Sequence, residues 1–215
     1  MTQRSFRRAS GDERSQALIK ATLASIAEGG LQNATVRDIA QRAGVTAGLI
    51  RHYFPSKEAL IQAAYRALMQ DLTDNVMAAL SDVPSLSAGQ RLQRFIEANF
   101  QAAVLDSQML SLWAAFISVV PSDPAMKAIH QEHYLAFRDS LEQLLTAFFQ
   151  AQGKAIKASE TEQAAIAINA IIDGLWIEGC LAQHLLSAER LAALAVQSTE
   201  AILGMRLQAN HEANC

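Results

Sequence analysis

Apolar residues along this chain recur at spacings of three and four, and rarely at a spacing of two. That spacing matches the 3.6-residue period of an α-helix and not the alternation of a half-buried strand. Hydrophobic residues make up 51% of the 215 positions, and only 10 glycines and 4 prolines interrupt them. The pattern predicts an all-α protein with enough apolar surface for a substantial core.

Two helices are predicted first. One spans about residues 12–28 and stops at Gly29-Gly30, since glycine is the usual residue after a helix end. The next begins at Thr35, whose hydroxyl can cap it while Asp38 reaches back in a capping box.

A tight turn then leads into a third, short helix. Gly44 supplies the permissive backbone conformation, Thr46 caps the helix, and Ile50 and Phe54 face inward. Two short helices joined by a glycine turn and braced by a longer helix are typical of a helix-turn-helix, although ordinary helical bundles contain the same pattern.

From Ser56 onward, cap residues predict further helices in one domain. They are a fourth capped by Ser56 and running past Met69, a fifth behind Ser87 and Gln90, a sixth over about 107–120, a seventh from Asp123-Pro124 to about Gln152, an eighth capped by Ser159 with Glu162, and a last from Ser187 to about Leu207. The predicted domains are therefore 1–60, with the helix-turn-helix, and 61–215.

The formal net charge of -3 conceals an uneven distribution. Up to Arg66 there are ten basic and five acidic residues, whereas the remainder holds eight basic and sixteen acidic residues. A basic front end on an acidic protein indicates that this end meets a polyanion.

Cysteine usage and hydropathy point to the cytoplasm. Cys180 and Cys215 give neither a disulfide framework nor metal-ligand spacing, and no signal-peptide pattern opens the chain. The most apolar stretch, 164–182, contains Asn169, Asp173 and Glu178, so it predicts a buried helix and not a membrane span.

The segment from Thr35 to Leu60, TVRDIAQRAGVTAGLIRHYFPSKEAL, resembles the DNA-binding signature of the TetR family of regulators. The likeness covers roughly 14–60, close to the N-terminus, where that family places its helix-turn-helix. It implies nine helices, a homodimer, binding of double-stranded operator DNA and a small-molecule effector.

The resemblance and the helix pattern assign the same DNA-binding residues, at the start of the third helix and at positions that contact the DNA backbone. They are Thr35, Thr46, Ala47, Gly48, Arg51, His52, Tyr53 and Lys57. Arg51 stands where the family often has tyrosine, so base and phosphate contact both remain open, and Tyr53 is equally compatible with core packing. Arg4, Arg7 and Arg8 could form an arm along DNA or a solubilising tail.

The last two helices are unusually apolar, which in the related family reflects a four-helix dimer interface, although a monomeric core would show the same pattern. The expected interface residues are Ile168, Ile172, Leu175, Leu191, Leu194 and Ile202.

A narrower likeness links Asn99-Phe100, Trp113 to Phe116, Pro124 and Ile172 to Trp176 to choline-responsive repressors of glycine-betaine synthesis genes. Aromatic faces and a carboxylate hold a quaternary ammonium, which cannot hydrogen-bond. The implied ligand residues are Phe100, Trp113, Phe116, Asp173 and Trp176. Aromatics at helical spacing are also common core residues, and Ile117 replaces a tryptophan of that subgroup.

An enzyme is the competing class. His130 and His133, with Glu132 between them, could bind a metal, but no further ligand cluster accompanies them, and a solvated helix face explains them better. No nucleophile motif or phosphate-binding loop is present, so the sequence predicts a non-enzyme without cofactor or metal. A helical ligand carrier without DNA binding is the remaining alternative.

Overall fold

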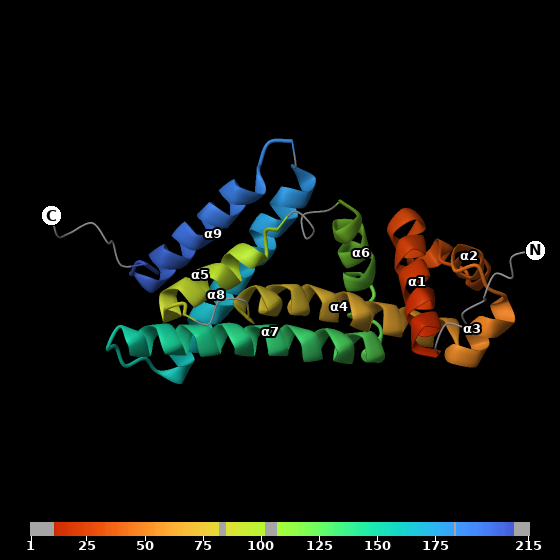
Figure 1. Ribbon diagram of the computed structural model, residues 1–215, viewed down its shortest axis with the longest axis horizontal. Helices are drawn as coiled ribbons and strands as arrows, with labels where there is room; N and C mark the ends of the chain where they lie inside the picture. Colours follow the sequence, from red (N-terminus) through yellow and green to blue (C-terminus); the bar gives the residue numbers. More distant parts are fainter. Residues whose placement is uncertain (1–10, 82–84, 102–106, 183, 209–215) are drawn as a thin grey trace, which may run out of the picture. The chain divides into compact units, whose positions relative to one another are not determined.

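The computed structural model describes residues 11–81, 85–101, 107–182 and 184–208, and this part of the chain is entirely helical apart from its connections (Figure 1). Its nine helices confirm the all-α prediction. They are α1 (Gly11–Asn33), α2 (Val36–Arg42), α3 (Ala47–Tyr53), α4 (Lys57–Ser81), α5 (Ala88–Ala98), α6 (Ser107–Ile117), α7 (Pro124–Ala151), α8 (Ala158–Leu181) and α9 (Ala188–Leu203).

The helices gather into two compact units. Unit 1 contains α1 to α3, α4 up to Leu68, and residues 111–129. Unit 2 contains the remainder of α4, α5, α7 from His130, and the α8 and α9 pair. The predicted arm residues Arg4, Arg7 and Arg8, together with Cys215, lie outside the described residues.

Cap residues set most of the helix boundaries, as the sequence predicted. Thr46 Oγ1 accepts from Leu49 N at 3.3 Å, Ser56 Oγ accepts from Ala59 N at 3.1 Å, and both halves of the Ser87 and Gln90 capping box are formed. Asp123 Oδ1 accepts from Ala125 N and Met126 N at the start of α7. These side chains satisfy backbone N–H groups that the first turn of a helix leaves without partners.

Several helix ends differ from the prediction. α8 begins at Ala158 with Lys157 as its N-cap, because the carboxylate of Glu160 reaches back to Lys157 N at 3.1 Å, and the Ser159 and Glu162 pair is not used. α9 stops at Leu203, since Gly204 adopts a left-handed conformation with φ 63°. α6 ends at Ile117, three residues before the predicted end.

Glycine interrupts α1 as predicted, but the helical assignment continues beyond it. Gly30 has φ 75° and ψ 170°, so the helix breaks there and a short final turn runs to Asn33. Asn33 Nδ2 donates to Gly29 O at 2.8 Å and fastens that turn.

Each unit has its own apolar core. In unit 1 the buried set is Leu18, Ile19, Ile26, Ile39, Ile50, Leu60, Tyr65 and Phe116. In unit 2 it is Leu92, Phe95, Ile96, Phe100, Leu141, Leu145, Phe148, Ile168, Ile172 and Leu191. Burial of such side chains is the main favourable term for each unit, at roughly 25 cal/mol per Å² of apolar surface.

The chain after α9 folds back against α5. A Cβ on Gly89 would collide with the carbonyl of Leu207, so only glycine permits this approach. Leu207 N donates to Glu200 Oε1 at 2.9 Å, and Gln208 Nε2 donates to Gln93 Oε1 at 2.8 Å. The turn fixes the C-terminal end of α9.

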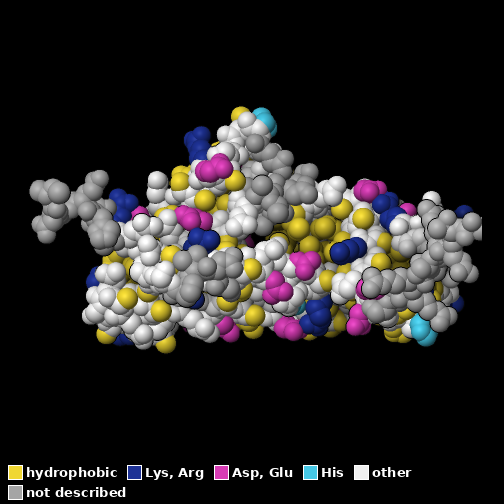
Figure 2. Space-filling view, viewed as in Figure 1, with side chains coloured by type: hydrophobic (Ala, Val, Ile, Leu, Met, Phe, Trp, Pro, Cys, Tyr) yellow, Lys and Arg dark blue, Asp and Glu magenta, His cyan; other side chains and the backbone are white. Residues whose placement is uncertain are grey.

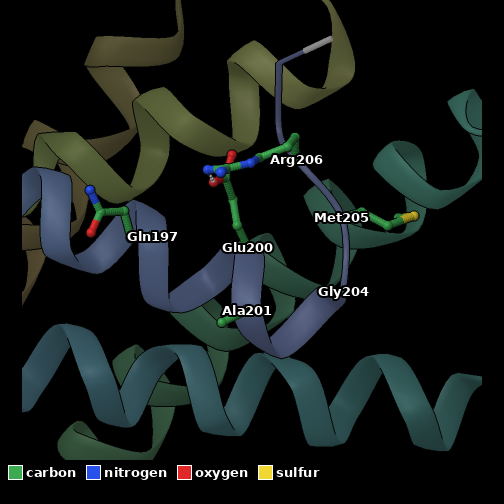
Figure 3. A pocket seen from close by; sticks show the side chains of 6 residues that line it. All are labelled: Gln197, Glu200, Ala201, Gly204, Met205 and Arg206. Carbon is green, nitrogen blue, oxygen red and sulfur yellow. Dashed lines mark hydrogen bonds and ion pairs between the residues drawn. The ribbon is translucent and has the colours of Figure 1, made fainter. Parts of the chain in front are cut away.

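An open hollow of about 530 Å³ lies beside this turn (Figure 3). The ion pair of Arg206 Nη1 with Glu200 Oε2, at 2.6 Å, lies on its wall. The lining residues are Gln197, Glu200, Ala201, Gly204, Met205 and Arg206, so none of the predicted ligand residues belongs to it.

α8 is the described helix that is long and apolar enough by composition to cross a membrane, with a mean hydropathy of 1.5. One side of it is buried in unit 2, including Ile168, Asn169 and Trp176, and α8 packs against α9. These contacts are those of a core helix, as the sequence predicted.

Candidate functional site

The turn between α2 and α3 has the geometry of a helix-turn-helix. Gly44 has φ 64°, and Val45 N donates to Ala40 O at 2.9 Å, which closes the turn. Ile39 and Ile50 are buried on either side of it, so the two helices share one small core. Their packing fixes the orientation of α3.

The predicted DNA-binding residues lie on the outer side of this pair. Ile50 is buried, whereas the residues at the start of α3 and its next turn face solvent. Those exposed are Thr35, Thr46, Ala47, Gly48, Arg51 and His52, while Tyr53 and Lys57 are half-buried. The rings of His52 and Tyr53 meet edge to face with centroids 5.3 Å apart. An exposed α3 of this kind can enter a major groove.

A network of charged side chains fastens α2 to α1. Arg42 donates from Nη1 and Nη2 to both carboxylate oxygens of Glu28, at 2.9 and 2.8 Å, and from Nε to Asp38 at 2.7 Å. Ser25 Oγ donates to the same oxygen of Asp38 at 2.6 Å. Asp38 therefore bonds to Ser25 and Arg42 and does not complete the predicted capping box, although Thr35 still caps α2. We name Ser25, Glu28, Asp38 and Arg42 the α1–α2 clamp.

The charges of the clamp support one another. The hydrogen bonds and charge of Arg42 hold the pKa of Glu28 below its usual value. Ser25 first, and Arg42 second, lower the pKa of Asp38, and the two carboxylates in turn raise the pKa of Arg42. Sequence reasoning missed the clamp because Glu28 and Arg42 lie on different helices, where no helical spacing relates them.

Two of the predicted ligand residues belong to unit 1. Phe116 is fully buried and stacks on Tyr65, with ring centroids 4.7 Å apart and an angle of 25° between the planes. Burial raises the pKa of Tyr65 to about 12. One face of Phe116 is thus occupied by core packing, whereas Trp113, almost one turn earlier, is half-buried.

The other three belong to unit 2. Asp173 and Trp176 lie almost one turn apart on α8, so both side chains project near the same side of the helix. Trp176 is 9% exposed and Phe100, which follows α5, is buried. Asp173 is exposed as a residue, yet burial raises the pKa of its carboxyl to about 6, against the opposing hydrogen bond of 3.1 Å from Asn169 Nδ2. Protein atoms therefore crowd this carboxylate on the sides away from solvent.

The expected dimer residues fall into two groups. Ile168, Ile172 and Leu191 are buried within unit 2, so they fill the core of the single chain. Leu194 and Ile202 are exposed on α9, at 38% and 40%, and Leu175 is half-buried on α8. Among the exposed large apolar residues is also Ile166 on α8, which the sequence had not separated from its buried neighbours.

The helix carrying His130 and His133 differs from the predicted solvated face. His133 is buried, at 6% exposure, and His130 stacks on Tyr134 with centroids 5.9 Å apart. The apolar period of α7 explains this, because His133 falls in register with the buried Ile129 and Leu141. No group of three metal-ligating side chains occurs in the described part of the chain.

Two family descriptions match this chain. The segment 18–64 matches the bacterial regulatory proteins of the TetR family, and 88–204 matches the C-terminal domain of BetI-type transcriptional repressors. This chain belongs to the TetR family. Its members are DNA-binding transcriptional regulators and not enzymes, and its C-terminal half is of the BetI type.

Relatives along nearly the whole length agree with this membership. The HTH-type transcriptional regulator BetI of Escherichia coli K12 is 33% identical over 84% of this chain and 89% of its own length. A transcriptional regulator of Pseudomonas aeruginosa PAO1 has a solved structure with a TM-score of 0.81 and 34% identity, covering 93% of each chain. A Saccharomonospora viridis regulator, solved in complex with choline, shares the fold with a TM-score of 0.73 at 22% identity.

The clamp of this TetR-family head can be tested by Arg42→Gln. The substitution removes the charge that balances Glu28 and Asp38, so we expect a lower melting temperature, by no more than about 2–4 °C because the clamp is solvent-exposed. Both carboxyl pKa values are lowered in the folded chain, so the clamp stabilises above the ordinary carboxyl pKa and is lost on acidification. The measurement is thermal unfolding at neutral pH in low and high salt.

Arg37→Gln on the same helix is the matched control, since Arg37 is exposed. The expected loss for Arg42→Gln shrinks in 1 M salt, while Arg37→Gln changes little in either condition. Equal melting temperatures for Arg42→Gln and the wild-type chain in low salt would contradict the role given to the clamp.

Proposed function

We propose that this chain is a cytoplasmic homodimeric repressor that binds operator DNA through α3 and releases it when a small quaternary ammonium compound, such as choline, binds unit 2. The observation that supports it most is the exposed, doubly capped α3 presented by the clamp. The carboxylate of Asp173 beside Trp176 supports the choice of a cationic effector.

Operator recognition is assigned to two kinds of residue. Arg51 and His52 stand on the exposed side of α3, within reach of base edges or phosphates. Thr35, at the start of α2, and Lys57, at the start of α4, flank α3 and suit phosphate contact. The basic excess of the first 66 residues adds an attraction to DNA that does not depend on sequence.

Arg51→Ala tests operator binding. We expect the affinity for the chain's own upstream intergenic DNA to fall about tenfold or more, because a guanidinium contact to a base or phosphate is lost. The measurement is a binding titration at several salt concentrations. A smaller salt slope with unchanged sequence preference indicates a phosphate contact, and relaxed preference indicates a base contact.

Lys154→Ala is the matched charge control, because Lys154 is exposed in the connection after α7. Its affinity is expected to stay near the wild-type value. Binding of the wild-type chain to all DNA with equal affinity would overturn the repressor proposal.

The dimer is assigned to the exposed apolar side of α8 and α9. Figure 2 shows apolar side chains reaching the surface over α9, and they include Leu194 and Ile202. An isologous contact along this helix pair would add Ile166 and Leu175 from α8. Two heads related by such a two-fold axis suit half-sites about 34–36 Å apart in successive major grooves.

Leu194→Glu tests the dimer, since a charge in the middle of an apolar interface is costly to desolvate. We expect a shift from dimer to monomer in light scattering at micromolar concentration. Leu135→Glu is the matched control, because Leu135 is similarly exposed, at 44%, on α7. A dimeric Leu194→Glu chain, or a monomeric wild-type chain, would refute this assignment.

The effector is assigned from the chemistry of α8. A trimethylammonium group cannot donate a hydrogen bond, so an anionic oxygen beside an aromatic face is the pair that recognises it. Asp173 and Trp176 provide that pair, and Phe100 supplies a further buried ring in unit 2. The effector lowers operator affinity if it favours the conformation that binds DNA poorly, and DNA then weakens the effector by the same factor.

Asp173 makes this proposal sensitive to pH. Only the ionised carboxylate attracts a cation, and with its pKa at about 6 we expect the affinity for choline to fall about tenfold between pH 7.5 and pH 5. Asp173→Asn is expected to bind weakly at both pH values and to lose this dependence. The measurement is calorimetric titration of the full chain with choline.

Glu178→Gln is the matched control, an exposed carboxylate five residues further along α8. It is expected to keep both the affinity and the pH dependence. Choline binding that is equally strong in Asp173→Asn would exclude this carboxylate from the site, and absence of binding by the wild-type chain would reject choline as the effector.

A further inference from the structure

One buried polar atom in unit 2 has no partner. Two buried side-chain nitrogens of the described residues lack a hydrogen bond, His133 Nε2 and Arg138 Nε. Arg138 Nε lies 3.4 Å from Glu142 Oε1 and its Nη2 lies 3.9 Å from Glu162 Oε1, so its charge is balanced. His133 Nε2 is therefore the nitrogen whose desolvation the fold leaves uncompensated, at a cost of about 1–3 kcal/mol for such groups.

The position of His133 on α7 is on the inner face of the helix. His130, Tyr134 and Arg138 form a row at four-residue spacing, joined by ring stacking and a cation-π contact of 5.9 Å. His133 and Phe137 form the neighbouring row, and Phe137 meets Phe95 of α5 with centroids 4.9 Å apart. Since residues four apart share a helix face, His133 projects toward the interior on the side of α5.

The direction of the two helices then places His133 near one end of α5. Figure 1 shows α5 and α7 running in roughly opposite senses, so a step back from Phe137 on α7 leads toward the C-terminal end of α5. Phe100 follows directly after that end and is buried. His133 and Phe100 thus belong to the same part of the interior of unit 2.

We infer that His133 is a specificity-determining residue of the effector site, whose Nε2 hydrogen-bonds a hydroxyl or carbonyl oxygen placed two carbons from the ammonium centre. This inference rests on the proposed function, because it names the second functional group of the same effector. An imidazole nitrogen can donate to, or accept from, a hydroxyl, and a buried polar atom without a protein partner rejects a ligand that lacks the matching group. A small quaternary amine without an oxygen would leave Nε2 unsatisfied.

The test compares choline with ethyltrimethylammonium, which has the same cation and carbon chain but no hydroxyl. Both are titrated calorimetrically into the wild-type chain, His133→Leu and His133→Gln. For the wild-type chain we expect choline to bind about tenfold more tightly than ethyltrimethylammonium. For His133→Leu that preference is expected to vanish through loss of choline affinity alone, and His133→Gln is expected to restore part of it.

Thermal unfolding without ligand supplies a second readout. His133→Leu removes a buried polar atom without a partner, so its melting temperature is expected to equal or exceed that of the wild-type chain. A stable His133→Leu chain that loses choline selectivity supports the inference.

Other outcomes would overturn it. If His133→Leu weakens both ligands equally, or neither, the residue acts in packing and the quaternary-amine proposal stands without it. If the wild-type chain binds both ligands with equal affinity, no group reads the hydroxyl. If it binds neither, the proposed effector fails, and the role of His133 fails with it.

Discussion

The whole reading head depends on a helix that cannot hold itself. α2 has only seven residues, and isolated helices of that length are not stable in water, so tertiary contacts must fix it. Buried Ile39 supplies the apolar part of that contact, and the clamp of Ser25, Glu28, Asp38 and Arg42 sets the rotation of α2 on α1. Because α3 is joined to α2 by the Gly44 turn, the direction in which α3 points is determined by these contacts.

Unit 2 reverses this economy, because its groups of interest are poorly satisfied. Asp173 is kept at a raised pKa, so its charged form weakens the fold above about pH 6, and His133 Nε2 is buried without a partner. Stable cores avoid such groups, whereas binding sites retain them, since a ligand can supply what the protein leaves out. By contrast, the clamp is fully paired and has no unmet demand, which fits a structural role.

Sequence reasoning recovered the features that are local along the chain. Thr46, Ser56, Ser87, Asp123 and Ser187 each cap the helix assigned to them, because a cap depends only on residues two or three positions away. Features that depend on tertiary packing were missed or misassigned. Ile168 and Leu194 look alike in sequence, yet one is buried and the other exposed, and His133 was placed on a solvated face although its helix register buries it. The bond of Ser25 to Asp38 crosses two helices and leaves no periodic signal.

The two unsatisfied groups also constrain how a ligand could influence the fold. A cation beside Asp173 favours the ionised carboxylate and therefore lowers its pKa, so binding near pH 6 must release protons. An oxygen placed at His133 Nε2 removes a desolvation cost that the free chain bears in every conformation in which this nitrogen stays buried. A ligand that carries both groups thus stabilises the conformation in which Asp173 and His133 are held as they are here. Only that differential stabilisation, and not tight binding by itself, can shift the equilibrium between conformations with high and low affinity for DNA.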